Sequence, residues 1–180
     1  MDAESLIELF PYEDTEAAAN FLASLKNTPN IQRVFTSIDS AAFNFAKTNF
    51  PQKTIMIDRL DVRKRLLNGL ETVQKGNDDS QDFPRLRRHW KLLNNVEEAI
   101  PVTSKDYVFL TDVLDAFPRI GVAYWLKEAG MDIYRKATGQ RKLVNDWIDS
   151  GKHNILPYEQ LQQCMTQAKE PVVRFAVQYN

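Results

Sequence analysis

Apolar residues recur every three or four positions along most of the chain, and this spacing predicts a mainly helical protein. The clearest stripe is Val62, Leu66, Leu70 and Val73, which predicts a helix over 59–74. Similar patterns predict several other helices. They cover residues 2–9, 15–26, 40–49, 84–99, 110–117, 122–129 and 157–168, and one more helix holds Val144, Trp147 and Ile148 and ends at Gly151.

Two short β-rich segments, IQRVFTS and KTIMID, flank the helix over 40–49, which Asp39 or Ser40 can cap. Strand, helix and strand joined by short loops are typical of a βαβ unit, here 31–58, whose two strands run parallel. IQRVF also fits a helix. A strand over 131–136 and a terminal strand over 171–178 are predicted as well.

We therefore expect an α+β, predominantly helical fold, in which a small sheet of about three or four strands is covered by helices. The chain of 180 residues is divided by its patterns into two regions. Residues 1–100 form an N-terminal helical region with the βαβ-like unit, and 101–180 hold a helix-turn-helix-like region with a terminal helix and strand. One compact domain is equally consistent with this length.

The composition is that of an ordinary globular protein, with 43% hydrophobic and 26% charged residues and a net charge of −1. Cys164 is the single cysteine, so no internal disulfide forms. The first ten residues, MDAESLIELF, lack the basic start of a secretory signal. Apolar runs fall far short of the roughly 20 residues that span a bilayer. These features predict a cytoplasmic or nuclear protein, in a host cell if viral, with no membrane partner.

Residues 110–151 contain a short helix, a turn bracketed by Pro118 and Gly121, a second helix closed by Gly130, and the strand-like MDIYRK before Thr138-Gly139. This arrangement resembles the winged helix-turn-helix of MerR-type and phage-excisionase-type DNA-binding domains. The resemblance implies that the second helix enters the major groove and that a wing grips the DNA backbone. Tyr134, Arg135, Gly139 and Arg141 then stand in the wing.

The facing of the second helix decides which side chains could reach DNA. If Val122, Trp125, Leu126 and Ala129 face the core, Arg119, Tyr124 and Lys127 point outward. The structural alternative is that two short helices and a hairpin are ordinary core architecture, with Trp125 and Trp147 as core anchors rather than ligand platforms. Glu128 and Asp132, which lie among the basic residues, would also oppose phosphate. The candidate nucleic-acid-binding residues are Arg119, Tyr124, Lys127, Arg135, Lys136, Arg141 and Lys142, joined by the basic cluster Arg85, Arg87 and Arg88.

Two functions follow from these patterns. The first is a non-enzymatic nucleic-acid-binding protein of a regulatory, phage or mobile-element type, for which DNA is the favoured partner and RNA the other. The alternative is a protein–protein interaction module, an inhibitor or adaptor, that uses the acidic N-terminus or exposed aromatic residues such as Tyr12 and Phe83. A protein partner or self-association belongs to the second hypothesis.

Enzyme motifs are not found: the chain has no Gly-rich phosphate loop and no nucleophile elbow, so no catalytic residue, cofactor or metal is predicted. Asp58, after a predicted parallel strand, could bind Mg²⁺ together with Asp61, but a helix cap is the simpler interpretation. Cys164 and His153 could form a nucleophile–base pair, whereas a structural cysteine is favoured.

Overall fold

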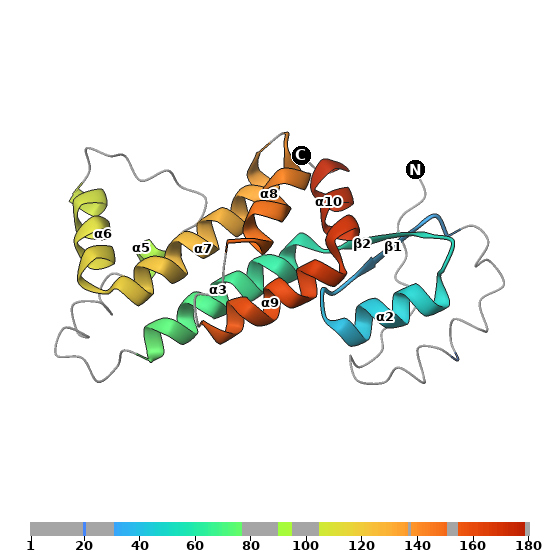
Figure 1. Ribbon diagram of the computed structural model, residues 1–180, viewed down its shortest axis with the longest axis horizontal. Coiled ribbons are helices and arrows are strands. Elements are labelled where there is room, and N and C mark those ends of the chain that lie inside the picture. The colour runs from blue at the N-terminus through green and yellow to red at the C-terminus, as the bar shows by residue number, and fades with distance from the viewer. Residues whose placement is uncertain are drawn as a thin grey trace, which may run out of the picture.

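The computed structural model describes residues 20, 31–76, 90–94, 105–136, 138–150 and 155–178. Within these ranges it contains a two-stranded parallel sheet and eight helices, so the predominantly helical α+β fold is confirmed (Figure 1). None of the described helices is both long and apolar enough to cross a membrane. The helices predicted over 2–9 and 15–26 lie outside the described residues. Of the helix predicted over 84–99, the structure describes α5 (Trp90–Asn94).

The predicted βαβ unit is confirmed. Strand β1 (Arg33–Thr36), helix α2 (Ser40–Asn49) and strand β2 (Thr54–Ile57) follow one another, and the strands pair in parallel with Thr36 opposite Ile57. Asp39 caps α2, because its carboxylate accepts a hydrogen bond from Ala41 N over 2.9 Å. The helical interpretation of IQRVF is therefore wrong for the residues of β1.

Helix α3 (Arg59–Lys75) is the central element of the fold, and it matches the predicted helix closely. Asp58 caps it by accepting from Leu60 N over 2.9 Å. The predicted stripe of Val62, Leu66, Leu70 and Val73 is buried. This stripe packs against α7 (Pro118–Arg135) and α9 (Leu156–Gln167), which lie beside α3 (Figure 1).

The predicted turn, wing strand and hairpin of the helix-turn-helix are absent from the described residues between 110 and 150. Helix α6 (Lys105–Ala116) includes the predicted first helix except Phe117, but α7 then continues without a break from Pro118 to Arg135. Gly130 is not a helix end: a Cβ there would come within 2.7 Å of Leu66 Cδ2 and 3.1 Å of Trp147 Nε1. The glycine therefore serves the close approach of α7 to its neighbours, and the strand predicted over 131–136 is a helical turn with a buried face.

The C-terminal helices complete the core. The predicted helix containing Val144 and Trp147 is α8 (Gln140–Ile148), and the helix predicted over 157–168 is α9. The terminal strand predicted over 171–178 is wrong: these residues belong to helix α10 (Lys169–Gln178), which packs on β2. Val172 and Ala176, one helical turn apart, are buried there, while Arg174 and Val177 are exposed. The described sheet thus has two strands rather than three or four.

A buried tyrosine connects the three long helices. Tyr158 of α9 shares its hydroxyl proton between the backbone oxygens of Leu66 on α3 and Ala123 on α7, at 2.9 and 3.0 Å. Its ring lies against Gly69, where a Cβ would come within 2.8 Å of the ring. The packing of α3 against α7 and α9 therefore fixes the position of α3. Its first turn, which directly follows β2, is fixed with it.

Candidate functional site: an acidic edge beside the parallel strands

Three aspartates gather where the two parallel strands end, and we call Asp39, Asp58 and Asp61 the acidic edge. Asp39 lies three positions beyond the last residue of β1, and Asp58 directly follows β2. The backbone N–H of Asp58 donates to the carbonyl oxygen of Thr36 over 3.1 Å, so the two strand ends are aligned. The carboxyl ends of parallel strands are where open α/β sheets usually place their ligand sites.

Asp61 joins the two halves of this edge. Its Oδ2 accepts hydrogen bonds from Ser37 Oγ at 2.9 Å and from Ile38 N at 2.8 Å, both in the turn after β1. Arg65 Nε donates to the same oxygen at 3.3 Å, and the Arg65 guanidinium also lies 3.9 Å from Asp39. Arg65 therefore partly neutralises Asp39 and Asp61, whereas no ion pair of Asp58 is found among the described residues.

Basic side chains follow immediately on α3. Arg59 and Lys64 are exposed, and they stand within the first two turns of the helix that Asp58 begins. A helix N-terminus itself attracts anions, because its first backbone N–H groups are unpaired and its dipole is positive there. The edge thus combines carboxylates with a phosphate-attracting surface.

The structure places two predicted nucleic-acid-binding residues in the interior. Lys127 is fully buried; its Nζ donates to Leu93 O at 2.6 Å, pairs with Glu128 at 2.6 Å and lies 4.3 Å from the centre of the Tyr124 ring. Burial lowers the pKa of Lys127, and Glu128 opposes that shift. Tyr124 is buried as well, while Trp125 is 63% exposed. The expected facing is therefore wrong for Tyr124, Lys127 and Trp125, because the Lys127 side of α7 contacts Leu93 of α5. It is right for Leu126, which is buried, and for Arg119, which is exposed.

Four of the candidate nucleic-acid-binding cations, in and beside the predicted wing, are paired with carboxylates. Arg135 Nη1 and Nη2 both donate to Glu128 Oε2 at 2.9 Å, and Lys136 Nζ lies 2.9 Å from Asp132 Oδ2. Arg141 forms a two-pronged contact with Glu170, and Lys142 pairs with Asp146. These side chains lie on α7, the following residue and α8, not on a wing, and their charge is largely compensated.

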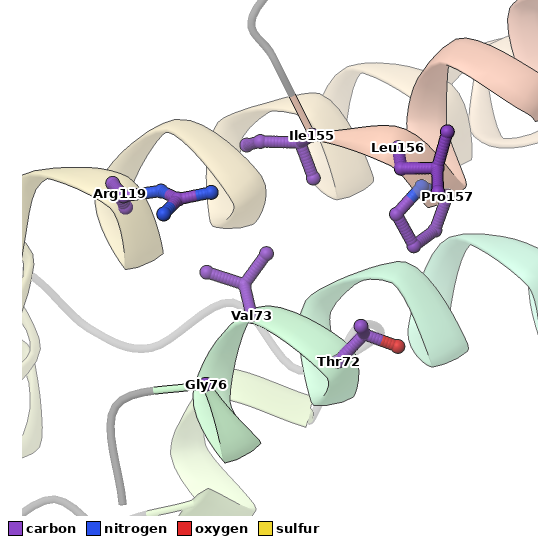
Figure 2. Close-up of a pocket in the computed structure, with 7 residues that line it drawn as sticks. All are labelled: Thr72, Val73, Gly76, Arg119, Ile155, Leu156 and Pro157. Carbon is purple, nitrogen blue, oxygen red and sulfur yellow. The ribbon is translucent and has the colours of Figure 1, made fainter. Parts of the chain in front are cut away.

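Arg119 is exposed and lines a groove of about 210 Å³ between the ends of α3, α7 and α9. Figure 2 shows its guanidinium extending from α7 into the space above Val73. Arg85, Arg87 and Arg88 lie outside the described residues. The groove is lined by Thr72, Val73, Gly76, Arg119, Ile155, Leu156 and Pro157.

The acidic edge meets only part of the requirement for a metal site. Within the described ranges, no three Asp, Glu, His or Cys side chains are close enough to hold a metal ion between them. Mg²⁺, however, is commonly bound through one or two carboxylates and completes its shell with water and substrate phosphate. Asp58 and Asp61 fit such a partial ligand set, and the buried Tyr134 hydroxyl, without a hydrogen-bond partner, feels the charge of both.

Cys164 does not have the properties of a nucleophile. Burial raises the pKa of its thiol, Arg65 lowers it, and Asp39 and Asp61 raise it further. A raised pKa leaves the thiol protonated and unreactive near neutral pH. The partner considered for it, His153, lies outside the described residues, and the structural interpretation of Cys164 remains the simpler one.

Sequence reasoning found Asp58 and Asp61 but assigned them to a cap, and it gave Asp39 only a capping role. A usable signal was present: each strand of the predicted βαβ unit is followed within three residues by an aspartate. The sequence analysis assigned Tyr134 to a wing strand, whereas the structure has it on α7. The sequence pattern therefore did not indicate where Tyr134 lies.

The comparisons with known proteins give one match. The family model DDE_Tnp_ISL3, described as Transposase, matches residues 1–179. No curated protein and no solved structure matches the chain. The matched range includes all three residues of the acidic edge, and no MerR-type or excisionase-type match accompanies it.

Proposed function

Because the chain belongs to the ISL3 family of DDE transposases, we propose that it acts on mobile-element DNA and that its acidic edge faces the reacting phosphodiester. The prediction of a non-enzymatic protein was wrong, since the family is one of DNA-cutting enzymes. DNA is the partner that the family implies, in agreement with the first sequence hypothesis. The interaction-module alternative gains no support from the match.

One observation supports the acidic edge as the site that acts on DNA. Both parallel strands end at the same level, and each is followed by an aspartate. Asp58 and Asp39 reach this level from β2 and β1, and Asp61 bonds the turn after β1 to α3. Carboxylate oxygens at such an edge are the ligands that Mg²⁺ and Mn²⁺ prefer.

Acidic and basic side chains have different roles in this proposal: the carboxylates bind a divalent cation, and the basic side chains bind phosphates. A divalent cation at the edge would polarise the phosphodiester and lower the pKa of an attacking water. Asp58 uses Oδ1 for the cap of α3, so its carboxylate can offer the second oxygen outward. Arg59 and Lys64, both exposed on α3, are placed to hold the neighbouring phosphates of the DNA backbone.

Nicking of supercoiled plasmid DNA by the full chain in Mn²⁺ tests this proposal. In the Asp58→Asn variant the cap is retained, because Asn caps helices as well as Asp does. We expect the nicking rate to fall by about 100-fold or more, because loss of a group that merely orients a metal ligand already costs about 10–100-fold. Asp112→Asn, an exposed site on α6, is the matched control and should leave the rate unchanged. A wild-type rate for Asp58→Asn would contradict the proposal.

A further inference from the structure

Among the residues that the structure describes, the hydroxyl of Tyr134 is buried and has no hydrogen-bond partner. Tyr134 lies in the last turn of α7 and is 9% exposed, and its ring meets Phe175 of α10 edge-on with 6.3 Å between centroids. The hydroxyl of Tyr158, by contrast, is bonded to two carbonyl oxygens. Buried polar groups are almost always hydrogen-bonded, so an orphaned one requires an explanation.

The pairing of α7 with α3 places Tyr134 near the first turn of α3, which follows Asp58 directly. The two helices run in opposite directions (Figure 1), and Gly130 lies against Leu66. One turn further along α7 is Tyr134, and one turn back along α3 is Val62, within the first turn after Asp58. Burial first, and then the charges of Asp58 and Asp61, raise the pKa of Tyr134 well above its ordinary value. The hydroxyl therefore stays protonated and can donate.

We infer that Tyr134 is a positioning residue for Asp58: when DNA and a divalent cation occupy the acidic edge, its hydroxyl donates a hydrogen bond to the Asp58 carboxylate. This inference rests on the proposed function of the edge. Asp58 is the better acceptor because Asp61 Oδ2 already accepts from Ser37, Ile38 and Arg65. The ring itself is held in place, since Phe175 also packs edge-on against Phe35 of β1 at 6.0 Å. Such a bond fixes the rotamer in which Asp58 faces the ligand.

Titration of the full chain with Mn²⁺ in the presence of duplex DNA, followed by electron paramagnetic resonance, tests the role of Tyr134. In Tyr134→Phe we expect Mn²⁺ affinity to fall about 10-fold and the kcat of nicking to fall similarly, with an unchanged KM for DNA. The melting temperature should hold, because the hydroxyl that is removed has no partner within the described ranges.

Tyr158→Phe is the matched control, since it removes a buried hydroxyl that is bonded. It should lower the melting temperature and leave Mn²⁺ affinity unchanged. Wild-type Mn²⁺ affinity in Tyr134→Phe would overturn the inference, as would a loss of thermal stability without a change in affinity. If Asp58→Asn loses Mn²⁺ binding while Tyr134→Phe keeps it, only this inference fails. If Asp58→Asn keeps it, the proposed function fails.

Discussion

The Oδ2 atom of Asp61 lies 2.8 Å from the backbone nitrogen of Ile38 and accepts its hydrogen bond. This contact spans 23 positions of the chain and joins the turn after β1 to the first turn of α3. Ser37 Oγ reinforces it from the same turn at 2.9 Å. Asp39 and Asp58 therefore hold their relative places partly through a third carboxylate, which stands between their two segments.

Removal of this carboxylate should weaken the fold measurably. In Asp61→Ala the N–H of Ile38, the hydroxyl of Ser37 and the guanidinium of Arg65 all lose their acceptor. We expect a loss of about 2 kcal/mol in the free energy of unfolding, the usual size for hydrogen bonds to a charged group. Urea denaturation of the wild type and of Asp61→Ala measures this difference in the free energy of unfolding. Asp112→Ala, exposed on α6, should change stability by about 0.5 kcal/mol or less; equal effects of the two variants would refute this role.

Substitution of Gly130 should cost stability by overpacking. A Cβ at this position would meet Leu66 Cδ2 at 2.7 Å, and Leu66 is itself fully buried. Gly130→Ala should therefore lose about 1–3 kcal/mol of unfolding free energy, in spite of alanine's better helix propensity. Gly76→Ala is the control, because Gly76 is exposed with a helical φ of −68°. A stabilised Gly130→Ala variant would show that α3 and α7 do not pack as described.

The sequence predicted the fold correctly where a single helix or strand determines the pattern of apolar and polar residues. The stripe from Val62 to Val73 and the strands around α2 were found because each pattern has a single period. Gly130 was misinterpreted, because a glycine after an apolar run indicates a helix end unless the tertiary partner is known. That partner, Leu66, lies on another helix. The β-branched residues of α10 similarly favoured a strand, and only packing on β2 selects the helix.

The site was harder to predict because charge patterns do not show which partner neutralises a side chain. The pairs of Lys136 with Asp132 and of Lys142 with Asp146 have the spacing of adjacent helical turns and could have been anticipated. Arg141 and Glu170 stand 29 positions apart, so their contact depends on the fold. Burial of Lys127 likewise depends on the docking of α5.

DNA binding should depend on the cations beside the acidic edge more than on the paired cations of α8. A double variant, Arg59→Gln with Lys64→Gln, should weaken duplex binding and reduce the slope of log K against log salt by about 2. Arg141→Gln with Lys142→Gln removes the same formal charge from residues that carboxylates already neutralise. Fluorescence anisotropy of labelled duplex DNA, measured over a series of salt concentrations, compares the affinities of the two double variants. A larger effect of the second pair would move the DNA surface to α8.

Alkaline pH should destabilise the chain through its buried tyrosines. Burial, then the charge of Glu128, raises the pKa of Tyr124 to about 12, while Arg135 lowers it. Between the unfolded value of 10.0 and about 12, the unfolded chain has therefore lost a proton that the folded chain keeps. Stability then falls with rising pH, by about 1.4 kcal/mol per pH unit for this group.

The Tyr124→Phe variant isolates that contribution. The ring that faces Lys127 is kept, so its packing should change little. We expect a shallower decline of unfolding free energy above pH 10 than in the wild type. Urea denaturation at a series of pH values measures both slopes, and identical slopes would mean that Tyr124 ionises equally in both states.

Affinity cleavage with Fe²⁺ tests the location of the site most directly. Iron that replaces the native cation reduces added hydrogen peroxide to hydroxide and a hydroxyl radical, and ascorbate returns Fe³⁺ to Fe²⁺. The radicals cut the polypeptide next to the residues that bind the iron. With DNA present, the account predicts peptide fragments that end near Asp39 and near Asp58, and their loss in Asp58→Asn. Cuts confined to other segments, or an unchanged fragment pattern in the variant, would contradict it.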